Sequence, residues 1–121
     1  MTTIPAYWLF LLFAWLPGGV QPPADMPRDL IVNVRALPMD GYACVGSDSQ
    51  YCKAGEIAIT DRIWSEKGWA AQHIIAHEVG HFLYPNDGEW GAEQYACKTT
   101  RLATRTYNME CVNGTLRTVL R

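Results

Sequence analysis

The sequence predicts a small α+β domain, and three observations predict it. The chain has 121 residues, of which 49% are hydrophobic, which is enough for one globular domain. Runs with strand character precede a segment with helical periodicity, and a second helical segment follows after a brief turn. Near the C-terminus, Asn113-Gly114 separates two strand-like runs, as is typical of a β-hairpin. We therefore expect a short mixed or antiparallel sheet, two helices and a C-terminal hairpin.

Two segments ahead of the first helix have strand character. They span residues 29–35 and 55–60, and both alternate or cluster aliphatic, β-branched side chains. From these residues alone, each segment predicts a strand of the sheet.

The segment 68–84 predicts the first helix. Its apolar residues recur at helical spacing and form a stripe that faces the core: Ala71, Ile75, Val79 and Phe82. Pro85 follows directly and ends the helix.

This helix carries the motif HEVGH at residues 77–81, which has the form HExxH. Residues four apart share one helix face, with Cβ atoms about 5–6 Å apart, so His77 and His81 can bind one metal ion. At about 100° per residue, both histidines fall off the apolar stripe. Glu78 points toward the same cleft, where it can act as general base on a metal-bound water. The motif therefore predicts Zn2+ bound by His77 and His81, with Glu78 as the catalytic residue.

Catalytic zinc usually has three protein ligands and one water, so a third ligand is needed. His73 lies about 12 Å from His81 along the helix, at about 1.5 Å per residue, which is too far to share the ion. We expect His73 to lie on the surface or to contact a ligand without touching the metal. A second helix is predicted over about 88–103, and three acidic residues stand at or near its start: Asp87, Glu89 and Glu93.

These acidic residues differ in their other possible roles. The segment 86–89 matches a capping box with Glu89 at the third helical position, so Glu89 is interpreted as structural. Asp87 lies in the turn and can stabilise the start of the helix electrostatically. Glu93 lies one turn further on and faces the first helix if the two helices pack antiparallel. Small Ala96 permits that close approach.

HEVGH followed by Glu-Gln-Tyr-Ala at 93–96 resembles the gluzincin pattern, with HExxH on one helix and a zinc-binding Glu on the next. The short gap resembles compact gluzincin-like peptidases, including the minigluzincins and the small HExxH proteases linked to phage and stress repressors. The resemblance covers residues 55 to about 103 and implies a zincin-like domain that hydrolyses peptide bonds. It implies that zinc is bound by His77, His81 and Glu93, and that Glu78 is the base.

The same resemblance implies where a peptide substrate binds. In zincins generally, an edge strand beside the active-site helix holds the substrate as an added strand. That strand would be 55–60, although an ordinary core strand is an equal alternative. The donor that steadies the oxyanion is left unassigned among Tyr84, Tyr95, Tyr107 and His73.

A second resemblance gives a different third ligand. Metzincins read HExxHxxGxxH, and in that register Asp87 would bind the metal. The glycine of that pattern is replaced here by Tyr84, which is followed by Pro85. Because glycine suits an unusual backbone conformation far better than tyrosine, Glu93 is favoured over Asp87.

The N-terminus predicts export. Residues 7–16 are strongly apolar, but this run is shorter than the roughly 20 residues of a membrane span and suits a signal peptide. No Lys or Arg precedes Arg28 and no clear cleavage site follows, so an uncleaved membrane anchor stays open. We expect 1–24 to be a signal peptide or apolar leader with a linker, and 25–121 to be the domain of a secreted or periplasmic protein.

Cysteine usage agrees with export. The chain has four cysteines, and an even number in a short, exported chain predicts two disulfides. Three pairings are possible, and we favour the local one, which joins Cys44 to Cys52 and Cys97 to Cys111. A cysteine-based zinc site is not supported because no C-x-x-C pair is present.

Two functions of different classes fit these patterns. The first is a monomeric zinc metallopeptidase acting on a peptide or protein substrate. The alternative is a secreted, disulfide-stabilised binding or inhibitory module in which the HExxH motif is structural or inactive. A net charge of −2 without a basic cluster gives no support to nucleic-acid binding. Contact with a membrane is expected only through the N-terminal apolar segment, if it is not cleaved.

Overall fold

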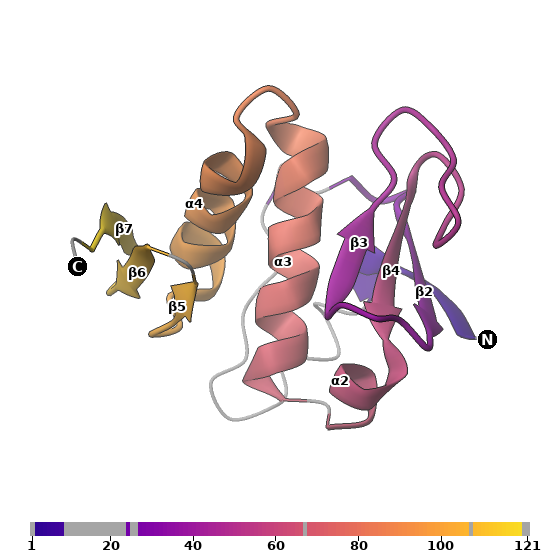
Figure 1. The fold of residues 1–121 in the computed structure, drawn as a ribbon, viewed down its shortest axis with the longest axis horizontal. Helices are drawn as coiled ribbons and strands as arrows, with labels where there is room; N and C mark the ends of the chain where they lie inside the picture. Colours follow the sequence, from indigo (N-terminus) through magenta and orange to yellow (C-terminus); the bar gives the residue numbers. More distant parts are fainter. Residues whose placement is uncertain (1, 9–23, 25–26, 67, 107, 120–121) are drawn as a thin grey trace.

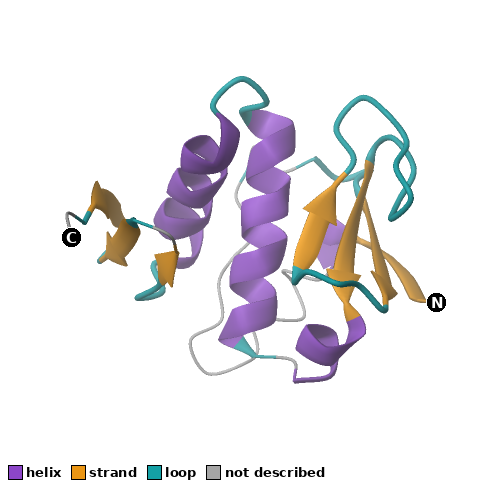
Figure 2. Cartoon of the chain, viewed as in Figure 1, coloured by secondary structure: helices purple, strands orange, loops and turns teal. Residues whose placement is uncertain are grey.

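Two β-sheets lie on either side of a pair of helices in the computed structural model (Figure 1). The structure describes residues 2–8, 24, 27–66, 68–106 and 108–119. Along the described chain, the strands of one sheet come first, the helices follow, and the strands of the other sheet come last, without a repeated βαβ pattern (Figure 2). The predicted α+β class is thus confirmed.

The first sheet is mixed and has the strand order β1-β2-β4-β3. β2 and β4 are parallel, and the two outer pairs are antiparallel. The predicted strands at 29–35 and 55–60 are confirmed as β2 and β4. The four strands are β1 (Thr2–Pro5), β2 (Ile31–Arg35), β3 (Gly41–Ala43) and β4 (Glu56–Thr60).

β4 lies inside the sheet, so the prediction that 55–60 is a substrate-binding edge is wrong. Its two sides pair with β2 and β3, and β3 is the strand at this end of the described sheet. β3 was not predicted because three residues are too few to show an alternating pattern. The short helix α2 (Asp61–Glu66), also unpredicted, continues directly from β4.

The core lies between this sheet and helix α3 (Trp69–Leu83). Alternate residues of the two central strands face the helix, as the two-residue period of a strand requires. The helix contributes a stripe of fully buried side chains that includes Ile75 and Val79. The predicted apolar stripe is therefore confirmed, and Phe82 packs at its partly buried end. The core side chains from the strands are Val32, Val34, Ile57 and Ile59.

Helix α4 (Gly88–Thr100) lies alongside α3 and returns antiparallel to it after a short turn (Figure 1). The backbones touch at Gly80, where an added Cβ would lie 2.8 Å from Ala92 Cα and 3.0 Å from its carbonyl oxygen. Only glycine fits that contact. α4 ends at Thr100, three residues before the predicted end near 103, and its C-cap residue Arg101 has a left-handed φ of 56°.

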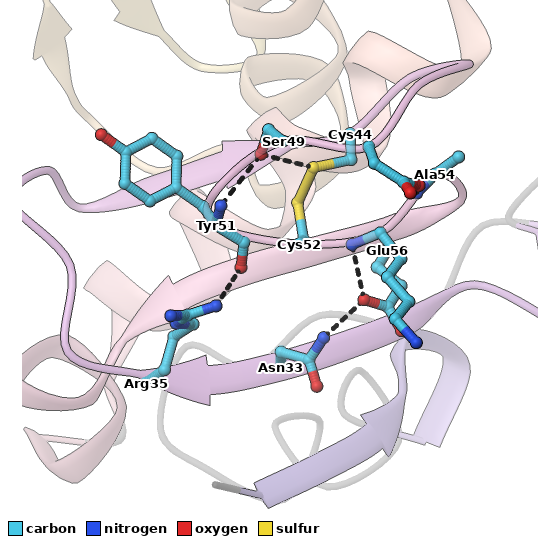
Figure 3. The surroundings of a disulfide bond; sticks show 10 residues. Asn33, Arg35, Cys44, Ser49, Tyr51, Cys52, Ala54 and Glu56 are labelled. Carbon is cyan, nitrogen blue, oxygen red and sulfur yellow. Dashed lines mark hydrogen bonds between the residues drawn. A yellow bond between two sulfur atoms is a disulfide. The ribbon is translucent and has the colours of Figure 1, made fainter.

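The disulfide between Cys44 and Cys52 confirms the first predicted pairing. It closes a loop that joins β3 to β4, and Figure 3 shows the loop's hydrogen bonds. Ser49 Oγ lies 3.1 Å from Cys44 Sγ and accepts a hydrogen bond from the Tyr51 backbone N–H. Arg35 of β2 donates to the Tyr51 carbonyl at 2.7 Å. The disulfide and the Ser49 contacts thus hold the loop together, and Arg35 fixes it to the sheet.

The second disulfide joins Cys97 of α4 to Cys111, as predicted. Cys111 belongs to a separate antiparallel sheet with the order β5-β6-β7. Asn113 and Gly114 both have positive φ, 51° and 82°, so the predicted type I′ hairpin is confirmed. The strands are β5 (Arg105–Thr106), β6 (Met109–Val112) and β7 (Thr115–Thr118).

The N-terminal segment enters the first sheet. β1 lies within residues 1–24, which the sequence assigns to a leader, yet it pairs with β2 and is followed by the fully buried Ala6. Residues 9–23, with most of the apolar run, lie outside the described residues. In the part of the chain that is described, no helix has the length and apolar character needed to cross a membrane. The two disulfides indicate an oxidising, non-cytoplasmic location.

Gly80→Ala tests the close contact of the helices. Alanine would ordinarily gain about 1 kcal/mol over glycine in a helix. Here its methyl group would meet the Ala92 backbone, and overpacking of this kind costs about 1–3 kcal/mol. We expect a net loss of stability in urea unfolding of the oxidised protein. Gln94→Ala, on the exposed side of α4, is the control and should change stability by less than about 0.5 kcal/mol. A stabilised Gly80→Ala protein would contradict the contact.

Candidate metal centre

A cavity of about 720 Å³ lies between β3, α3 and the first half of α4. All three histidines of the chain line it. Residues 39–43, Val45 and Thr106 of β5 also line it. The acidic residues at the cavity are Asp40, Glu78, Glu89 and Glu93.

The histidines of the HExxH motif converge as their spacing predicts. His77 Nε2 and His81 Nε2 lie 3.2 Å apart, and the two rings meet edge to face. Both side chains are largely but not completely buried. With Glu78, they form a group in which one possible ligand atom from each residue lies within 4.8 Å of the other two.

Glu89 completes this convergence, although the sequence assigned it to a capping box. Its Oε2 lies 3.0 Å from His77 Nε2, and its Oε1 lies 3.2 Å from His81 Nε2. The N-cap residue of α4 is Asp87, and no side chain caps this helix end. The capping-box interpretation is therefore wrong, because the carboxylate of Glu89 turns toward the two imidazoles.

Glu93 lies on the other edge of the His77 ring. Its Oε1 is 2.6 Å from His77 Nδ1 and 3.2 Å from His73 Nε2. Burial alone would raise the pKa of Glu93, but hydrogen bonds from His73 and His77 outweigh it and lower the pKa to about 2. The structure thus brings Glu93 to the motif but does not bring it to the two Nε2 atoms.

Together these five side chains alternate as a histidine–carboxylate ladder, in the order His81, Glu89, His77, Glu93 and His73. The ladder follows from helix geometry. Side chains four residues apart lie on the same face of a helix. Because α3 and α4 are antiparallel, moving four residues toward the C-terminus of α4 corresponds to moving four residues toward the N-terminus of α3. The equal four-residue spacing of the histidines and of Glu89 and Glu93 is the signal that the sequence analysis missed.

The ladder sets the protonation of His77. Burial lowers the pKa of His77, but the hydrogen bond to Glu93 and the charges of Glu78, Glu93 and Glu89 outweigh it and raise the pKa. A proton on Nδ1 points at Glu93, so Nε2 is the ring nitrogen that faces the cavity, where Glu89 Oε2 lies 3.0 Å away. Burial, followed by the charge of His77, lowers the pKa of His81.

Glu78 lies beside the two Nε2 atoms without touching them. Its Oε1 is 3.9 Å from His77 Nε2 and 3.8 Å from His81 Nε2, and the side chain is almost fully buried. Burial raises its pKa to about 7. An added Cβ at Gly41 would lie 3.3 Å from Glu78 Oε2 and 2.8 Å from Ile74 Cγ2. β3 therefore runs close over the carboxylate, and a larger residue at position 41 would displace it.

The remaining site predictions lie elsewhere. Asp87 is exposed at the start of α4 and does not line the cavity. Tyr84 and Tyr95 pack toward each other outside the cavity lining. Tyr107 lies outside the described residues. Of the four side chains considered for the oxyanion, His73 alone among those described lines the cavity, and it is buried.

The donor atoms fit a tetrahedral zinc ion. With bonds of about 2.0–2.1 Å, the donors of such an ion are about 3.3 Å apart. His77 Nε2 and His81 Nε2 are 3.2 Å apart, and Glu89 places one carboxylate oxygen 3.0 Å from the first and the other 3.2 Å from the second. Two imidazoles and one carboxylate are also a donor set of catalytic zinc. The residues present therefore suit the metal that the motif predicts.

The chain matches no known family, no curated protein and no solved structure. The function is accordingly argued from the site itself.

The acid stability of the metal-free protein tests the pairing of Glu93. Its pKa of about 2 lies below the ordinary 4.5, so its stabilising contribution is complete above pH 4.5 and is lost as pH falls toward 2. Glu93→Gln should cost about 1–3 kcal/mol near pH 6, as for hydrogen bonds to charged groups. That difference should shrink toward pH 2 in urea unfolding with a chelator present. Asp29→Asn, exposed and away from the site, is the control. A difference independent of pH would contradict the pairing.

Proposed function

We propose that this protein is a small zincin-like metallopeptidase. His77, His81 and Glu89 bind Zn2+, and Glu78 is the general base. The observation that carries the proposal is the convergence of two Nε2 atoms and the Glu89 carboxylate beside the buried Glu78, in a cavity bordered by a strand edge.

The proposed ligand set replaces Glu93 of the gluzincin resemblance with Glu89. A carboxylate on Nδ1 of a histidine fixes the tautomer and orientation of the ring whose Nε2 binds metal. Glu93 has that position on His77 at 2.6 Å. A side chain that keeps this hydrogen bond cannot also reach an ion at Nε2, on the opposite edge of the ring. Glu93 thus orients the His77 ring without binding the metal itself.

Bound zinc would lower the pKa of a water molecule toward about 7 and polarise the carbonyl of the scissile bond. Glu78 takes the proton of the attacking water and passes it to the leaving amine. Its buried position raises its pKa to about 7, near the value at which a group both accepts and releases a proton readily. A nearby divalent cation would favour the ionised form that accepts the proton.

The substrate class follows from β3. This strand ends the described sheet, and residues 41–43 line the cavity beside Glu78. An extended peptide can pair with such an edge through main-chain hydrogen bonds, which demand little of its sequence. Gly41 and Ala43 lie opposite Ile59 and Ile57, so they share the face that looks toward α3. Small residues there leave space for the substrate backbone.

The proposed enzyme acts in a secreted or periplasmic location. The oxidising compartment indicated by the disulfides agrees with the export that the sequence predicts. The alternative, a disulfide-stabilised binding or inhibitory module, predicts that the protein folds with oxidised cysteines and binds no zinc.

Zinc content tests the proposed ligands. The oxidised full-length protein should hold about one zinc per chain after dialysis, as three protein ligands provide. Glu89→Gln should lose the metal, whereas Glu93→Gln should keep it with about 10–100-fold weaker affinity. Asp87→Asn, on the same turn but outside the cavity, should bind as the unaltered protein does. If Glu93→Gln loses the zinc and Glu89→Gln keeps it, Glu93 is the ligand. A folded protein without zinc favours the binding module.

Glu78→Gln tests the general base. The variant should keep about one zinc and lose at least about 100-fold in kcat, the lower range for general base catalysis. Cleavage of a mixed fluorogenic peptide library, with and without a chelator, measures this. Asp29→Asn is the exposed control and should keep full activity. Retained turnover in the zinc-loaded Glu78→Gln protein would exclude Glu78 as the base.

A further inference from the structure

We propose that His73 is a positioning residue for the metal centre, which acts through Glu93 on His77. This inference rests on the proposed zinc site. The sequence motif HExxH does not include His73, which lies one helical turn ahead of it.

One oxygen atom joins the two histidines. Glu93 Oε1 lies 3.2 Å from His73 Nε2 and 2.6 Å from His77 Nδ1. A buried carboxylate needs donors, and Glu93 has only 3% of its surface exposed. His73 supplies the second N–H, which fixes the direction of Oε1. Without it, the carboxylate could rotate and loosen its hold on the His77 ring.

Of the two ring nitrogens of His73, only Nε2 has a hydrogen-bond partner among the described residues. His73 is 5% exposed, and its Nδ1 has no hydrogen-bond partner among the described residues. The side chain is therefore anchored at Nε2, by Glu93. If His73 were an ordinary core residue, an apolar side chain would serve as well, because it would leave no buried nitrogen without a partner. The arrangement is explained by the N–H that His73 gives to Glu93.

The consequence for His77 is a fixed tautomer. Since Glu93 accepts the Nδ1 proton, the ring is held with Nε2 toward His81 and Glu89, the side on which a metal ion would bind. His73 thereby contributes to metal affinity without approaching the ion.

Two amide variants that differ in reach test the role. In His73→Gln, the amide nitrogen takes about the position of Nε2 and can still donate to Glu93. In His73→Asn, the amide is shorter and falls near the position of Nδ1. Zinc affinity is measured by competition with a chromophoric chelator on the oxidised full-length protein. We expect His73→Asn to bind about 10-fold or more weakly and His73→Gln within about threefold of the unaltered protein. Ile75→Val is the control, a buried change on the same helix outside the cavity lining, and should leave zinc affinity unchanged.

A double variant tests whether His73 acts through Glu93. Adding His73→Asn to Glu93→Gln should weaken zinc binding no further, because the intermediate carboxylate is already lost. Equal zinc affinity of His73→Asn and the unaltered protein would overturn the proposal. The proposal would also be overturned if the double variant lost as much zinc affinity as the two single variants together.

The metal-free protein gives a readout independent of zinc. The ¹⁵N shifts of the His77 ring should report a protonated Nδ1 in the unaltered protein and in His73→Gln, and partial loss of the Nδ1 proton in His73→Asn. An Nε2–H tautomer in the unaltered protein would overturn the inference, even if the His73 variants do not fold. If the unaltered protein binds no zinc, the proposed function fails, and the tautomer alone decides the role of His73.

Discussion

The architecture depends on the contact between the backbones of α3 and α4 at Gly80. A side chain there would collide with the Ala92 backbone, so the absence of one sets the separation of the helices. That separation decides whether the carboxylates of α4 reach the imidazoles of α3. At the distances observed, Glu89 and Glu93 each contact two histidines. A glycine within the HExxH motif thus determines the geometry of the candidate site as much as its histidines do.

The antiparallel helices also explain how so small a domain holds several buried ionisable groups. Each imidazole and carboxylate of the histidine–carboxylate ladder contacts the next one, and these contacts offset part of the free-energy cost of burying them. The pKa values of neighbouring carboxyls separate accordingly. Glu93, with two histidine donors, stays ionised to about pH 2, whereas Glu78, without a close donor, has a pKa near 7. One environment suits a fixed anion and the other suits a group that exchanges protons.

The sequence predicted those parts of the fold that have a strong local pattern. The period of α3, the Asn113-Gly114 turn and the local disulfides all depend on residues close in the chain. β3 has three residues and owes its place to its partner β4, so no local pattern could reveal it. The role of Glu89 was missed for a related reason. Its position predicts a helix cap, and only the packing of α4 on α3 turns its side chain to the histidines. The zinc ion, the activity and the leader remain predictions.

The disulfide between Cys97 and Cys111 has a consequence for when the site can form. Cys97 lies one turn beyond Glu93 on α4, and the bond attaches this helix to the C-terminal sheet. In a reducing cytoplasm the bond would be open, and α4 would be held to α3 by packing alone. The carboxylates would then reach their places at the histidines less often. A newly made chain would thus be a poor binder of metal until it met an oxidising environment. If the protein is the proposed hydrolase, it would thus stay inactive inside the cell that makes it.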